Sequence, residues 1–118
     1  MDRKKAVLNY LFSERAKTDL ITVSKMLALL SDYKGAERSG AKKFIVIFLG
    51  SVQSDLSQGF EKTGSVEFSR ASEMLEKAKN YLELDDLEQA SLEIGRAVSE
   101  CTTPAQNSWQ VLAENELV

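Results

Sequence analysis

The chain has 118 residues, of which 43% are hydrophobic and 28% charged, and it carries a formal net charge of −3 and no histidine. This length and composition predict one globular domain over residues 1–118 with a single core. The absence of histidine excludes Ser-His and Cys-His nucleophile pairs, histidine-containing metal sites and the Glu-x-x-His pairs of di-iron bundles.

The first predicted element covers residues 2–33, where no glycine or proline interrupts the chain. The pattern favours one long helix closed by Gly35. The alternative is two helices with a break near Thr18 and Asp19, because either side chain could cap a second helix. Apolar residues recur every three or four positions and therefore share one helical face; they are Leu8, Phe12, Ala16, Leu20, Val23, Leu27 and Leu30.

The second predicted helix runs from about Glu37 to Gly59. Residues 44–49 are apolar on nearly all sides, which predicts a central helix buried on several faces. Part of this apolar excess could instead remain free for a dimer interface. A β-strand is the alternative at residues 44–49, since β-branched and aromatic residues are enriched there. Helix is favoured because one stripe continues through the segment, formed by Ala41, Ile45, Phe48, Val52 and Leu56.

Three further helices are predicted in the second half of the chain. The third begins after Ser65, a suitable N-cap. The fourth begins at Asp85, which together with Glu88 resembles a capping box. The fifth begins at Thr103 with Pro104 at its first position, and it would cover the bundle as a lid. The predicted fold is therefore an all-α, four- or five-helix antiparallel bundle.

Residues 74–102 carry a more specific pattern, in which small and apolar residues flank a central pair of aspartates. The pattern consists of Ala78, Tyr81, Ala90, Ile94 and Ala97 around Asp85 and Asp86. This spacing resembles a single tetratricopeptide-type helical hairpin, whose small residues let two helices approach closely. Met74 stands where that repeat usually has a large aromatic residue, Pro104 comes about two residues late, and no second copy precedes it. The resemblance implies local helix–turn–helix packing without the peptide-binding groove of tandem repeats.

Four acidic residues form two pairs with the same spacing, Glu73 with Glu76 and Glu83 with Asp86. Such pairs could hold Mg²⁺. They superficially resemble the Glu-x-x-Glu and Glu-x-x-Asp motifs of all-α nucleotide pyrophosphohydrolases of the MazG type, where the motifs lie on two helices further apart in sequence. That resemblance would imply a Mg²⁺-dependent hydrolase. The favoured interpretation is a solvated acidic face at a helix–helix turn, with no cofactor.

Charge is divided unevenly along the chain. Residues 1–62 carry 11 Lys/Arg and 7 Asp/Glu, a net charge of +4, whereas residues 63–118 carry 4 and 11, a net charge of −7. We expect the basic half to pack beside the acidic half; head-to-tail pairing between copies is the alternative. Nucleic-acid binding through the basic half is disfavoured, because no aromatic residues are interleaved with the basic ones. The basic residues considered are Arg3, Lys4, Lys5, Lys42 and Lys43.

Two aromatic residues are predicted partner anchors, Tyr81 and Trp109, because aromatic side chains concentrate binding energy at interfaces. For Trp109, packing against the bundle is favoured over exposure to a partner. Cys101 falls on the apolar stripe of its helix and is predicted to be a small buried hydrophobe.

The predicted function is non-catalytic protein–protein interaction or self-association. The partner would be another protein or a second copy of the chain, as in a homodimer. No membrane partner is expected, since the longest apolar run, residues 44–49, is far shorter than the roughly 20 residues of a membrane span. The sequence also shows no signal-peptide pattern, so we expect a cytoplasmic protein.

Overall fold

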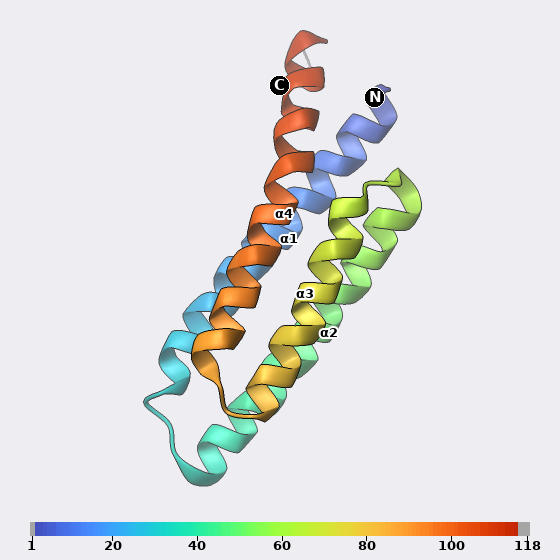
Figure 1. The fold of residues 1–118 in the computed structure, drawn as a ribbon. Coiled ribbons are helices and arrows are strands. Elements are labelled where there is room, and N and C mark those ends of the chain that lie inside the picture. Colours follow the sequence, from blue (N-terminus) through green and yellow to red (C-terminus); the bar gives the residue numbers. More distant parts are fainter. Residues whose placement is uncertain (1, 116–118) are drawn as a thin grey trace.

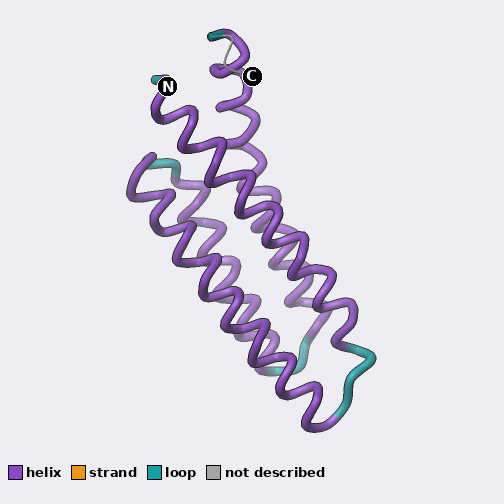
Figure 2. Tube along the Cα trace, turned by 180° about the vertical axis from the view of Figure 1, so that it is seen from behind, coloured by secondary structure: helices purple, strands orange, loops and turns teal. Residues whose placement is uncertain are grey.

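The structure, a computed structural model, describes residues 2–115 and folds them into an all-α bundle (Figure 1). Successive helices are antiparallel, and residues 2–115 contain no strand (Figure 2). The predicted bundle is therefore confirmed, with four helices over the described residues. These are α1 (Arg3–Leu30), α2 (Gly35–Thr63), α3 (Val66–Glu83) and α4 (Leu87–Glu114).

Each helix contacts two neighbours. α1 packs against α2 and α4, and α3 packs against α2 and α4, whereas the backbones of the diagonal pairs α1–α3 and α2–α4 stay more than 8 Å apart, Cα to Cα, along the described helices. The bundle is elongated, with extents of 53 × 22 × 18 Å. Both chain ends and the α2–α3 connection lie at one end of the bundle, and the two other connections lie at the opposite end (Figure 1). One side of every helix therefore remains open to solvent.

The core is formed by the apolar stripes of all four helices. Near the end that holds the chain termini, the rings of Phe12 and Phe68 meet edge to face with their centroids 6.3 Å apart. Gly59 lies against both rings: a Cβ at this position would approach Phe68 to 3.1 Å and Phe12 to 3.2 Å. A side chain at residue 59 would therefore displace the aromatic pair.

The first half of the chain follows the predicted helices, although α2 continues to Thr63, beyond the predicted end at Gly59. α1 is a single helix through Thr18 and Asp19, as favoured, and residues 44–49 are helical rather than a strand. Gly35, however, begins α2 and does not close α1. The chain turns earlier because the backbone N–H groups of Asp32 and Tyr33 already donate to the last carbonyls of α1, at 3.0 and 3.1 Å.

The start of α4 is one residue later than predicted. Asp86 is the N-cap, and its side chain accepts a hydrogen bond from the Gln89 backbone N–H at 3.2 Å. Asp85 instead has a φ of 59°, in the left-handed region. Aspartate is among the few residues that tolerate this conformation in a turn. The first aspartate therefore forms the turn, and the second one caps the helix.

The predicted fifth helix is wrong, because α4 runs through Pro104 to Glu114 without a break. Pro104 has no backbone N–H, so the carbonyl of Glu100 receives no hydrogen bond from it. The helix continues because its buried stripe stays in register across the proline. The stripe consists of Ala97, Cys101, Ala105, Ser108 and Leu112.

Cys101 is fully buried on this stripe, as predicted. None of the helices in the described part of the chain combines the length and apolarity needed to cross a membrane.

Candidate protein-binding surface

The outer side of α2 carries two large apolar side chains that the bundle leaves open. Phe44 is 76% exposed and Ile47 is 69% exposed. Ile45 and Leu49 belong to the same apolar run but are buried, because helical spacing turns them toward the core. The prediction that residues 44–49 are buried on several faces is therefore wrong for Phe44 and Ile47. We refer to these two residues as the α2 ridge.

Hollows lie on both sides of the α2 ridge. The larger, of about 510 Å³, lies between α2 and α3 and is lined by Val46, Ile47 and Leu82, with the stems of two lysines. The smaller, of about 240 Å³, lies between α1 and α2. Its lining is almost entirely apolar and includes Leu29 and Phe44. The ridge and its two flanking hollows together form one apolar region of the bundle surface.

Apart from Lys43, the outer face of α2 on either side of the ridge carries small or uncharged residues such as Gly40, Gly50 and Ser54. Gly40 and Gly50 have no heavy atom within 4 Å of the position that a Cβ would take. Residues 44–60 contain a single charged residue, Asp55, which pairs with Arg15 at 3.5 Å across the α1–α2 contact. An exposed helix face with so little charge is typical of a surface that is covered by another molecule.

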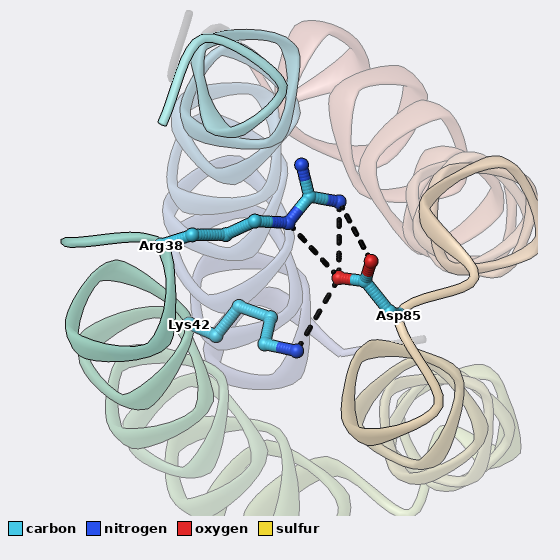
Figure 3. A network of polar contacts seen from close by, with 3 residues as sticks. All are labelled: Arg38, Lys42 and Asp85. Atoms are coloured by element: carbon cyan, nitrogen blue, oxygen red, sulfur yellow. Dashed lines mark hydrogen bonds and ion pairs between the residues drawn. The ribbon is translucent and has the colours of Figure 1, made fainter. Parts of the chain in front are cut away.

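A network of charged side chains fixes the start of α2 beside the larger hollow (Figure 3). The Arg38 guanidinium donates to both carboxylate oxygens of Asp85 at 3.0 Å, and Lys42 Nζ lies 3.3 Å from Asp85 Oδ1. The hydrogen bonds from Arg38 hold the pKa of Asp85 below its usual value, with a smaller contribution from Lys42. The basic half of the chain thus meets the acidic half at this point, as expected from the charge distribution.

We expect Asp85→Asn to lower the melting temperature at pH 7 and low salt, because asparagine keeps the turn but loses both ion pairs. The folded-state pKa of Asp85 lies below the ordinary value of 3.8, so its stabilisation is present above pH 3.8 and disappears as the pH falls through the lowered pKa. Wild type and variant should therefore converge as the pH falls below the lowered pKa, as measured by circular dichroism. Asp32→Asn, at an exposed aspartate outside this network, is the control. A difference that stayed constant with pH would contradict the assignment.

One of the predicted metal-binding carboxylates belongs to a second interhelical network. Glu76 accepts a hydrogen bond from Gln53 Nε2 at 3.0 Å and pairs with Lys79 at 3.1 Å. The bond from Gln53, followed by the interactions with Lys79, lowers the pKa of Glu76. Gln53 also receives a hydrogen bond from Lys79 at 2.9 Å, so the three side chains join α2 to α3. This carboxylate is engaged in helix packing.

The other three acidic residues do not gather around Glu76. Glu73 is exposed on α3, Glu83 lines the larger hollow, and Asp86 caps α4. Within residues 2–115, no group of three or more acidic or cysteine side chains is placed to hold a metal ion. The thiol of Cys101 is also unsuited to act as a nucleophile, because burial raises its pKa to about 12.

The two predicted aromatic anchors lie outside the α2 ridge. Tyr81 is half-buried and packs against the core cluster. Trp109 is 51% exposed, so the favoured expectation that it packs inside the bundle is wrong. With Tyr10 and Lys17 it lines a hollow of about 280 Å³ between α1 and α4.

Sequence reasoning identified the apolar run of the α2 ridge but not which of its residues are exposed. The available signal was the stretch from Phe44 to Phe60, which has one charge and several small residues. A helix surrounded by other helices also shows this composition, so the signal alone could not separate a central helix from one with an open apolar face.

The chain has no match among the protein-family models, curated proteins and solved structures with which it was compared. α3 and α4 do form an antiparallel hairpin over the residues that resemble a tetratricopeptide repeat. However, α4 alone has 28 residues, whereas the two helices of such a repeat share about 34. The resemblance therefore extends only to the close approach of two helices at small residues such as Ala78 and Ala90.

Proposed function

We propose that this protein is a non-catalytic protein-binding module whose contact surface is the α2 ridge with its two flanking hollows. The observation that carries the proposal is that Phe44 and Ile47, 76% and 69% exposed, lie one helical turn apart on the same face of α2. Covering such side chains removes apolar surface from water, which favours binding by about 25 cal/mol per Å² before the entropic costs of association are subtracted.

The geometry around the ridge supports a protein partner. Bulky apolar side chains beside hollows allow a partner's side chains to interlock with them, as in the packed centre of protein interfaces. Lys42 and Lys43 bring their charges to one margin of the larger hollow, which gives the apolar surface a polar edge. Charged residues at the margin of an apolar centre orient a partner more than they strengthen its binding.

The test compares two double variants that remove equal numbers of exposed apolar side chains. Phe44→Ser/Ile47→Ser removes the ridge, whereas Leu11→Ser/Leu92→Ser removes leucines that are 58% and 48% exposed on α1 and α4. Tagged proteins are expressed in cells with an untagged wild-type copy, and every captured protein, including that copy, is retested in purified form.

We expect wild type and the leucine variant to retain a partner that the ridge variant loses, with a reduction in affinity of at least tenfold. Both variants should keep wild-type helicity by circular dichroism, because the substituted side chains are exposed. Equal binding by all three proteins would overturn the proposal, and so would the absence of any partner that binds the purified wild type.

A further inference from the structure

We propose that the partner of the α2 ridge is a second copy of this chain, bound so that the two α2 helices lie antiparallel about a two-fold axis near Ile47. The inference rests on the proposed function and specifies its partner. Three properties of α2 support it: the low charge of its outer face, the distribution of large and small residues on that face, and the partial charges at its two ends.

The low charge of this face suits a contact between the same surface on two copies of the chain. In a two-fold contact every residue faces the same surface, so a charged centre would repel its own copy. Between Phe44 and Gln58, α2 has a single charged side chain, Asp55, which is 24% exposed and paired with Arg15 of α1. Lys43 is displaced from Ile47 by four residues, which separates the two copies of its backbone by about 12 Å along the helix axis.

Residues at equal distances before and after Ile47 have sizes that fit together in a two-fold contact. At 100° per residue, Gly40 and Ser54 lie seven residues on either side of Ile47 and on nearly the same line of the helix surface. Phe44 lies three residues before Ile47, and Gly50 and Ser51 lie three and four residues after it. Antiparallel pairing thus places each Phe44 over the small residues of the other copy. The contact from Gly40 to Ser54 would be about 21 Å long.

The ends of α2 favour antiparallel over parallel pairing through the helix dipole. Antiparallel helices place partial charges of opposite sign at the same end of the contact. Parallel pairing would instead place the two Lys43 side chains at the same height and leave Gly50 facing a second small surface. The self-complementary arrangement is therefore the antiparallel one.

The first experiment measures mass by light scattering and sedimentation over a series of protein concentrations. We expect a reversible dimer that Gly50→Arg weakens at least tenfold. Gly95→Arg on α4 is the matched control, since its Cβ position is equally open and the change in charge is the same. Both variants should fold, because arginine replaces a helical glycine without a steric conflict. Equal dimerisation by both variants would overturn the inference.

The second experiment tests orientation and register with Gly40→Cys and Ser54→Cys. Antiparallel pairing about Ile47 places residue 40 of one copy beside residue 54 of the other, whereas two copies of either residue are about 21 Å apart along the axis. A disulfide needs Cα atoms about 4.4–6.8 Å apart. We therefore expect cross-links in a mixture of the two variants and none with either alone. The native chain is the control for Cys101, which is buried.

Cross-linking of either variant by itself would show a parallel contact and overturn the inference, as would a dimer that no combination cross-links. A monomer at all concentrations would also overturn it. The proposed function would still stand if the α2 ridge bound a different purified protein, and it would fall with the inference if nothing bound. The two failures are therefore distinguishable.

Discussion

Replacing Phe68 with alanine should lower the free energy of unfolding by about 3–5 kcal/mol. Phe68 is fully buried, forms the edge-to-face contact with Phe12 and lies against Gly59. Alanine would leave a cavity that these neighbours fill only in part, because Phe12 and Gly59 are held by their own helices. Urea denaturation followed by circular dichroism measures the change.

Phe44→Ala is the matched control, because it makes the same chemical change on an exposed ring. We expect it to alter the free energy of unfolding by no more than about 0.5 kcal/mol at protein concentrations where the chain is monomeric. Similar losses at Phe68 and Phe44 would show that the assignment of buried and exposed faces on α2 and α3 is incorrect.

Stability should also fall above pH 9 because of Cys101. Burial, and to a lesser degree the charge of Glu100, raises the pKa of this thiol from 9.0 to about 12. The unfolded chain then loses the proton at a lower pH than the folded chain, so raising the pH favours unfolding between these two values. At pH 10.5 the expected loss is about 2 kcal/mol, since each unit of pKa difference corresponds to about 1.36 kcal/mol.

The measurement is urea denaturation of wild type and Cys101→Ala between pH 8 and 10.5. Other groups titrate in this range, so the quantity of interest is the difference between the two proteins. The free energy of unfolding of wild type should fall by about 2 kcal/mol relative to that of Cys101→Ala as the pH rises. The same pH dependence in both proteins would mean that the thiol ionises normally in the folded protein. A thiol reagent provides a second check, because it should label Cys101 only when the chain unfolds.

Helix content was predictable because each apolar stripe has helical spacing and lies in a stretch with few helix-breaking residues. The seven apolar positions from Leu8 to Leu30 correctly gave a single α1. Local signals failed where two residues competed for one role. Asp85 and Asp86 can each cap a helix, and the contacts that distinguish them form only in the folded bundle: Arg38 and Lys42 pair with Asp85, while Asp86 caps α4.

The sequence predicted the apolar composition of the candidate site but not the exposure of its side chains. Phe44 and Ile47 belong to an apolar run that suits either a central helix or a helix with one open side. The choice depends on how many helices surround α2, and within the described residues only α1 and α3 pack against it. The predicted anchors Tyr81 and Trp109 show the same limit, because an aromatic side chain does not reveal whether a neighbouring helix covers it.

Pro104 has a consequence for how α4 opens. Because the carbonyl of Glu100 receives no hydrogen bond from residue 104, the hydrogen-bond ladder of α4 is weakest at this point, although the helix is continuous. The segment from Ala105 to Glu114 can therefore detach as a separate cooperative unit, while the first four turns stay docked between α1 and α3. Slow amide exchange should accordingly be concentrated before the proline, in the part of α4 that carries Ile94 and Ala97.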